Sequence, residues 1–283
     1  MASRRPPPRI DPAPDPVDPA LAPLLGEPFA SAWSDGPDAS RASGPLRTRL
    51  LGRLAASKAA SAAMVTRRFA RLRPEPAGEG VSVRTLYAAE PGRAPRPGEP
   101  QRAALVELAP GARWTAPDAG VRREWLVLRG SVRIGTEPMT VRDYLNVPAG
   151  HPPQAVRSDD GALLFLRASQ VPGDAGGAAC CVRDAEVDWP EYAPGIRRRV
   201  LWRHGAQAAL LYHAAAGASV PVHRHGHDEE CLMVQGELFL DDVLLQPGDY
   251  QLAPAGTGHR VTETDTGVGL YAHGDLDLDF VDG

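Results

Sequence analysis

Residues 217–236 read GASVPVHRHGHDEECLMVQG, and residues 248–259 read GDYQLAPAGTGH. Glycine and proline break both stretches into short runs, which is typical of β-strands joined by tight turns. His223 and His225 are two residues apart, so on a strand both imidazoles point to the same face. The first stretch therefore predicts a strand that presents half of a metal site.

Two further side chains complete a candidate ligand set. Glu229 sits four residues after His225, past a turn at Gly226, so its carboxylate can approach the same ion from the side. His259 begins another predicted strand after a Pro-x-Gly turn and can supply a fourth ligand. Three imidazoles and one carboxylate suit Zn, Fe, Mn, Ni or Co and leave room for water or substrate. The alternative is a group of polar side chains on a surface loop, and Glu230 is a second carboxylate one position further on.

The sequence also contains an internal repeat with a constant shift. Residues 125–130 (WLVLRG) resemble residues 231–236 (CLMVQG), 106 positions later. The same shift relates turn glycines, prolines and apolar runs over about fifty residues without a gap. We therefore expect a mainly β protein with two copies of one domain, at about 78–170 and about 185–276, each a jelly-roll sandwich or barrel.

The first copy lacks the candidate ligands. The residues at the four equivalent positions are Pro117, Ala119, Arg123 and Pro153. Glu124 and His151 lie nearby, but two ligands from separate turns make a weak site. We predict a metal-free barrel kept for packing, dimerisation or an organic ligand. Arg123 can place a guanidinium in the pocket for a carboxylate or phosphate, although we expect it to turn outward to solvent.

The N-terminal part has a different composition. Residues 1–45 contain eleven prolines and are expected to be disordered. Leucines at helical spacing and a run of arginines predict a basic amphipathic helix over 46–74. That helix either packs its apolar stripe on the protein or binds an acidic partner, and we favour packing. Residues 171–184, which include the pair Cys180 and Cys181, are expected to be a linker.

Composition limits the class of protein. The chain has 283 residues, a net charge of −4 and 43% hydrophobic residues, which argues against a globally basic nucleic-acid-binding protein. No apolar run approaches a membrane span, and the first residues do not resemble a secretory signal. Three cysteines exclude a disulfide scaffold and favour a reducing cytoplasm. We expect a cytoplasmic protein, plausibly a homodimer, that binds one divalent ion per chain.

The two quoted stretches resemble the two motifs of the cupin family. The resemblance implies a jelly-roll β-barrel and metal ligands at His223, His225, Glu229 and His259. The six-residue spacing from the acid to Gly236 selects Glu229 over Glu230. Glu263 replaces the asparagine of the second motif, a position that does not bind metal. The matching residues are Gly217, His223, His225, Glu229 and Gly236 for the first motif, and Gly248, Pro254, Gly256 and His259 for the second.

Within that family the sequence is most similar to the cupin-like domain of ChrR-type anti-sigma factors. The shared features include Trp189-Pro, Pro221-Val-His-Arg-His and the pair Glu229-Glu230. The resemblance implies zinc and a regulatory or sensing module with a protein or small-molecule partner. The family's N-terminal zinc signature is absent, because no cysteine precedes Cys180, so anti-sigma activity is not implied.

Two other functions stay open. One is a metal-dependent dioxygenase acting on a small organic substrate, for which no catalytic residues can be assigned, and the other is a structural scaffold. The remaining candidates are interpreted as structural: His227 as a surface residue, His213 and His273 as ordinary strand residues, Tyr250 and Tyr271 as core aromatics, and Cys231 as a buried apolar residue.

Overall fold

The computed structural model describes most of the chain beyond residue 61. It divides into two units, Met1–Lys58 and Ala59–Gly283, and both β domains lie in the second unit. The predicted disordered segment 1–45, most of the predicted helix and residues 171–177 of the predicted linker lie outside the described residues. No described helix has the length and hydrophobicity of a membrane span. The described residues are 48–49, 51–52, 62–94, 96, 98–117, 120–170 and 178–281.

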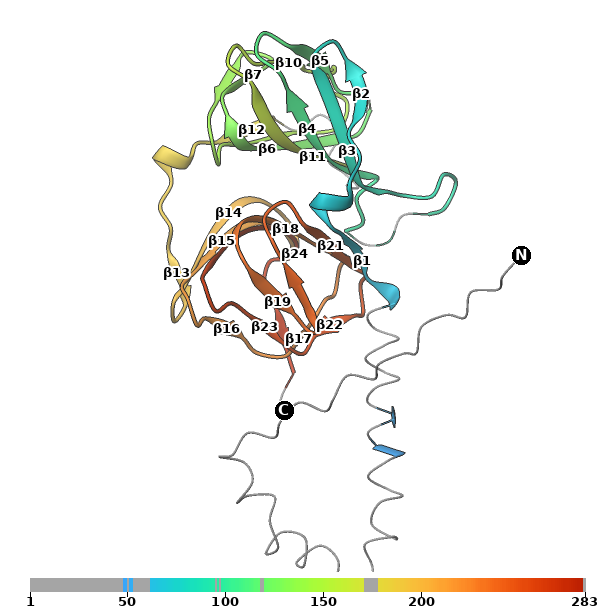
Figure 1. Ribbon diagram of the computed structural model, residues 1–283, viewed down its shortest axis with the longest axis vertical. Helices are drawn as coiled ribbons and strands as arrows, with labels where there is room; N and C mark the ends of the chain where they lie inside the picture. Colours follow the sequence, from blue (N-terminus) through green and yellow to red (C-terminus); the bar gives the residue numbers. More distant parts are fainter. Residues whose placement is uncertain are drawn as a thin grey trace, which may run out of the picture. The chain divides into compact units, whose positions relative to one another are not determined.

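The first β domain consists of two antiparallel sheets around an apolar core (Figure 1). Its strands are β2 (Glu75–Gly78), β3 (Val81–Ala88), β4 (Arg102–Leu108), β5 (Arg113–Thr115), β6 (Arg122–Gly130), β7 (Val132–Ile134), β8 (Glu137–Met139), β9 (Tyr144–Val147), β10 (Ala155–Arg157) and β11 (Ala162–Ser169). With β12 (Cys180–Val182), the large sheet has the order β12-β9-β6-β11-β4-β3-β2, and the small sheet has the order β5-β10-β7-β8.

The second β domain repeats this arrangement. Its large sheet has the order β1-β21-β18-β24-β15-β14-β13, and smaller sheets β16-β23-β19-β20 and β22-β17-β25 close the other side. The strands are β1 (Val65–Arg67), β13 (Glu191–Ala193), β14 (Ile196–His204), β15 (Gln207–Ala214), β16 (Ser219–Val220), β17 (His223–Arg224), β18 (Glu229–Gly236), β19 (Leu238–Leu240), β20 (Val243–Leu245), β21 (Tyr250–Ala253), β22 (Gly258–His259), β23 (Thr262–Glu263), β24 (Val268–Asp275) and β25 (Asp279–Phe280).

The large sheet of each domain includes one strand from a segment that lies next to the other domain in the sequence. Strand β1 precedes the first domain but pairs with β21 of the second, and β12 precedes the second domain but pairs with β9 of the first. The predicted helix over 46–74 is therefore wrong for its described end, where Val65–Arg67 is a strand and Phe69–Arg71 is a 3-10 turn. The linker assignment is likewise wrong for Cys180–Val182. The apolar residues read as a helical stripe do pack, because Val65 and Phe69 contact a buried cluster.

That buried cluster lies between the two large sheets and joins the domains. It combines Leu105, Leu126 and Phe165 of the first domain with Leu211 and Leu232 of the second. Side chains alternate along a strand, so each central strand serves the barrel on one face and the interface on the other. The two domains therefore form one packed unit.

The repeated turn glycines have a steric cause. Gly130 and Gly236 occupy equivalent positions, and both have φ near +70°, at 75° and 72°. A side chain at either position would collide with a backbone carbonyl, of Gly161 or of Gly267. Only glycine fits both the backbone angle and the close approach, which explains why the repeat keeps it.

Asp184 ties the segment before the second domain to both domains, and it yields a testable pH dependence. Its carboxylate accepts hydrogen bonds from Arg142 (Nη2–Oδ2 2.6 Å) and Arg199 (Nη1–Oδ1 2.6 Å). The Arg142 and Arg199 guanidiniums outweigh burial and hold the pKa of Asp184 below its ordinary value. A depressed folded-state pKa stabilises the protein at neutral pH, and this stabilisation is lost as the pH falls through that value.

Asp184→Asn is accordingly expected to lower the free energy of unfolding by about 1–3 kcal/mol at pH 7. The deficit should shrink toward pH ~3, where the wild-type carboxylate in the unfolded chain is largely protonated. Urea midpoints at both pH values measure the effect. Asp160→Asn, at an exposed position, is the control. A deficit that stays constant with pH would show that charge at Asp184 is not the cause.

Candidate metal centre

Two short paired strands place the first histidines. In the ladder between β17 and β22, His223 lies directly opposite His259. A side chain at Gly258 would collide with the carbonyl oxygen of His223, so glycine is needed for this close approach. His225 follows β17, and its backbone N–H donates to the Thr257 carbonyl at 2.9 Å. The segments around residues 223–225 and 257–259 are thus joined before any ligand is considered.

The predicted side chains converge on one point. The ligand atoms of His223, His225 and Glu229 lie within 4.8 Å of one another, and the group could hold a metal ion. His225 Nε2 is 3.3 Å from a Glu229 carboxylate oxygen. The His259 ring lies beside both, 5.7 Å from the His223 ring and 5.1 Å from the His225 ring between centroids. All three histidines are buried.

Hydrogen bonds to the outer nitrogens set the tautomers of two histidines. His223 Nδ1 lies 2.9 Å from the Pro221 carbonyl oxygen, and His259 Nδ1 lies 3.4 Å from an Asp241 carboxylate oxygen. Both oxygens only accept, so Nδ1 carries the proton and Nε2 keeps a lone pair. This carboxylate or carbonyl contact is the usual support of a metal-binding histidine. Sequence reasoning missed Asp241, because nothing in its own strand pattern marks a contact with His259.

The inner nitrogens fit a metal ion. Within the described residues, both ring nitrogens of His225 and Nε2 of His259 are buried and have no hydrogen-bond partner. Burial lowers the pKa of His223, which favours the neutral, metal-binding form. Burial opposes the ionisation of Asp241, but His259 and the backbone N–H groups of Arg260 and Val261 lower its pKa to about 2. The donor set therefore consists of three buried imidazoles with an ionised carboxylate behind one of them.

The ligand group opens into an apolar cavity of about 70 Å³ inside the second barrel. His223, Glu229 and His259 form its polar side. Among the described residues that line it, none is lysine or arginine. Thr262 Oγ1, in the wall, is buried and has no hydrogen-bond partner within the described chain. The apolar part of the wall includes Ile196, Val220, Cys231, Leu240, Leu270 and Leu278.

Alternation along β18 explains why the two adjacent glutamates differ. Glu229 and Cys231 face the barrel cavity, and burial raises the pKa of the Cys231 thiol well above its usual range. Glu230 faces the domain interface, where Tyr250 Oη of β21 in the same domain donates to its carboxylate at 2.8 Å. The prediction that Cys231 is buried is confirmed.

In the first barrel, the expected outward orientation of Arg123 is wrong. Arg123 is fully buried, and its Nη2 donates to the carbonyls of His151 (2.9 Å) and Pro152 (3.1 Å). It is equivalent to Glu229 in the sequence repeat, so the first barrel has a buried guanidinium where the second has a candidate carboxylate ligand. Ala119 lies outside the described residues. Glu124 points to the domain interface instead, and the one candidate metal group found in the described parts of the chain is that of the second barrel.

Glu124 belongs to a buried ionic network between the domains, which sequence reasoning did not foresee. Arg167 Nη1 donates to Glu124 at 3.0 Å, and Arg167 Nε donates to Glu230. Tyr144 Oη donates to Glu124 at 2.7 Å, as Tyr250 does to Glu230. Burial opposes ionisation, but the pKa of Glu124 is held well below its ordinary value by His273 and Arg167.

The remaining minor interpretations can be checked. Tyr250 and Tyr271 are fully buried, as expected. His273 is not an ordinary strand residue, because its buried ring lies 3.5 Å from Glu124 and stacks on Trp202. His227 bonds Asp275 through Nδ1, and His213 is exposed.

Comparison with known proteins agrees with this architecture. Residues 178–277 match the family model of the ChrR Cupin-like domain. A "putative dioxygenase" from Nostoc punctiforme has a similar structure, with 13% identity and a TM-score of 0.62 over 78% of this chain and 87% of that one. Oxalate decarboxylase from Lactobacillus farciminis matches with 13% identity and a TM-score of 0.55 over 76% and 87% of the two chains. No curated protein sequence matches.

The two barrels, the face-to-face sheets and the histidine group define the class of protein. Residues 178–277 match the ChrR Cupin-like domain family. The fold of the chain as a whole is similar to that of the solved structures named above. At these low identities the structural matches show the fold alone.

Proposed function

We propose that this chain is a metal-binding bicupin protein whose second domain holds one divalent ion and acts as a ligand-binding or sensing module. The observation that carries the proposal is the buried group His223, His225 and Glu229, which faces an apolar cavity. His259 is the proposed fourth ligand, since its free Nε2 lies beside the same group. The bound ion would supply Lewis acidity at the cavity wall.

The nature of the wall supports binding of a small, uncharged ligand. A carboxylate substrate would have only the bound ion as a partner of opposite charge, because the described wall has no lysine or arginine. The cavity is also small, about 70 Å³. These features favour a sensor over an enzyme for a charged substrate. The proposal further takes zinc as the ion, a protein partner that reads the state of the site, and a cytoplasmic homodimer as the setting.

The alternative function is a metal-dependent dioxygenase or related enzyme. The ligand group leaves space on its cavity side for water or substrate, and a structure described as a "putative dioxygenase" shares the fold. In that case the ion would be a redox-active metal rather than zinc.

Metal content per chain, measured by elemental mass spectrometry on untagged protein, tests the proposal. We expect one equivalent of zinc. One equivalent of iron or manganese would favour the enzyme, two equivalents would contradict the metal-free first barrel, and none after reloading would refute the proposed function. Titrating Co(II)-loaded protein with oxalate adds a second readout. The visible spectrum should change little, because Glu229 already offsets part of the ion's charge and the described wall has no lysine or arginine to balance a dicarboxylate.

A further inference from the structure

One hairpin has a longer loop in the first domain than in the second. In the first domain, the last paired residues of β3 and β4 are Ala88 and Arg102, with residues 89–101 between them. In the second domain, the matching strands β14 and β15 end on the pair His204 and Gln207 and are joined by a tight turn. The metal-free copy therefore carries an extra loop that the metal-binding copy lacks.

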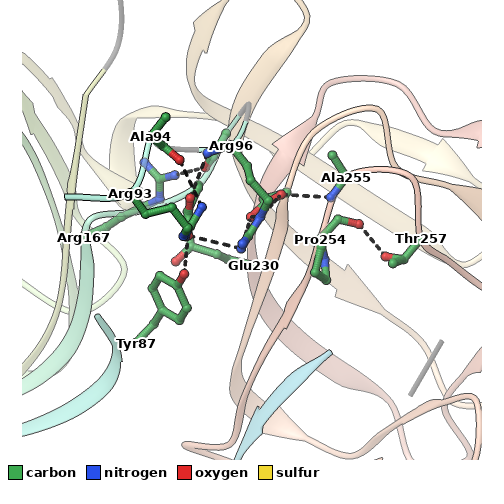
Figure 2. Close-up of polar contacts among 12 residues, drawn as sticks. Tyr87, Arg93, Ala94, Arg96, Arg167, Glu230, Pro254, Ala255 and Thr257 are labelled. Atoms are coloured by element: carbon green, nitrogen blue, oxygen red, sulfur yellow. Dashed lines mark hydrogen bonds and ion pairs between the residues drawn. The ribbon is translucent and has the colours of Figure 1, made fainter. Parts of the chain in front are cut away.

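Glu99 organises the described part of this loop. Its side chain is fully buried and accepts hydrogen bonds from the Tyr87 hydroxyl, the Arg93 guanidinium and the Arg96 backbone N–H, the last at 2.8 Å. The Gly98 carbonyl accepts a hydrogen bond from Arg167 Nη2 at 2.6 Å. These contacts fix the loop and direct the Arg96 side chain toward the second domain (Figure 2).

Arg96 ends on a carboxylate of the second domain. Its Nε lies 2.8 Å and its Nη2 2.7 Å from Oδ2 of Asp228, a fork-like contact with a fully buried carboxylate. Asp228 also accepts the backbone N–H of Ala255 at 2.9 Å. The loop backbone packs just as closely, since a Cβ at Gly98 would lie 3.0 Å from that of His227.

Asp228 connects the segments that carry the metal ligands. It lies in the turn between His225 and Glu229, and Ala255 lies in the turn that leads to His259. The same two turns are joined by the Gly256 N–H, which donates to the His225 carbonyl at 2.7 Å. One buried carboxylate thus holds both turns, and removing Arg96 would leave it without its cationic partner.

We infer that Arg96 of the metal-free domain is a positioning residue for the metal centre of the second domain. Through Asp228 it holds the turn between His225 and Glu229 and the turn before His259 at the spacing that one ion requires. The metal-free domain therefore supports the metal centre of the other domain across the domain interface. This inference rests on the proposed metal binding, but the ordering of the turn can be tested without metal.

The first test is zinc affinity by competition with a chelator. Arg96→Ala should weaken zinc binding about tenfold to a hundredfold, the usual effect of losing a supporting contact behind a ligand. Arg96→Lys should restore part of the loss, because lysine keeps the charge but not the fork. Adding Asp228→Asn to Arg96→Ala should also restore affinity, since asparagine accepts from Ala255 without an unpaired charge. Arg84→Ala, which removes a first-domain ion pair with Glu107, should not change it.

Two spectroscopic readouts separate positioning from general stability. The Co(II) absorption bands should shift in Arg96→Ala and not in Arg84→Ala. In metal-free protein, amide hydrogen exchange of residues 226–230 should be faster by about tenfold or more in Arg96→Ala, with the rest of the second domain unchanged. Wild-type affinity and wild-type exchange in folded Arg96→Ala would overturn the inference. Wild-type protein that binds no metal would refute the proposed function, and the exchange result would then decide the role of Arg96 alone.

Discussion

Replacing Arg167 with methionine is expected to lower the free energy of unfolding by about 3–5 kcal/mol. The side chain is buried between the domains and bonds two carboxylates, Glu124 and Glu230, both at most 1% exposed. Without the guanidinium, two buried negative charges face each other across a low-dielectric interface. Methionine fills similar space, so the loss reports the charge rather than a cavity. Denaturant midpoints measure it.

The pH dependence of this variant should identify the cause. In wild-type protein, burial opposes ionisation, but His273 and Arg167 depress the pKa of Glu124, so the network contributes stability at neutral pH and loses it in acid. In Arg167→Met the pKa of Glu124 should be higher than in wild type, because one of the cations that depress it is lost, and its protonation relieves the repulsion between the two glutamates. The stability difference between the proteins should therefore narrow as the pH falls from 7.

An exposed ion pair supplies the control. Arg129 bonds Glu107 at 2.9 Å with two thirds of its own side chain in solvent, at 67%. Arg129→Met should change stability by no more than about 1 kcal/mol. If Arg167→Met behaves like this control, the buried network does not stabilise the domain interface.

The repeat made the two-domain β fold predictable from the sequence. Turn glycines such as Gly130 and Gly236 are steric requirements, so they survive duplication and reveal the shift. The spacing of His223, His225 and Glu229 follows from strand alternation and one tight turn. These are local rules, and local rules can be read from a sequence.

Features that depend on the other domain could not be predicted in the same way. Val65–Arg67 has apolar neighbours at helical spacing, yet it forms a strand because it pairs with the edge of β21. The sequence predicts Arg123 as a surface residue, but the first barrel supplies carbonyl acceptors that allow its burial. Glu124, Arg167 and Glu230 meet only after the two large sheets pack together.

The second large effect concerns the metal. His225→Ala is expected to weaken binding of the divalent ion by more than about a hundredfold, beyond the loss seen for supporting residues. The apo protein should lose little stability, because neither ring nitrogen of His225 has a hydrogen-bond partner within the described residues. Metal titration and thermal unfolding with and without metal measure both quantities. His213→Ala, an exposed histidine of the same domain, should match wild type.

The adjacent glutamates provide the stricter control, because their side chains face opposite sides of β18. Glu229→Gln should weaken metal binding and leave the unfolding of the apo protein nearly unchanged. Glu230→Gln should keep metal affinity but lower stability by about 1.5–3 kcal/mol, since it removes a charged acceptor from Arg167. If Glu230→Gln were the variant that lost the metal, the carboxylate ligand would be Glu230, and β18 would have to present its opposite face to the cavity. In that orientation Glu230 could not bond Arg167. The metal titration and the stability measurement therefore test the same orientation of β18, one measurement for each face of the strand.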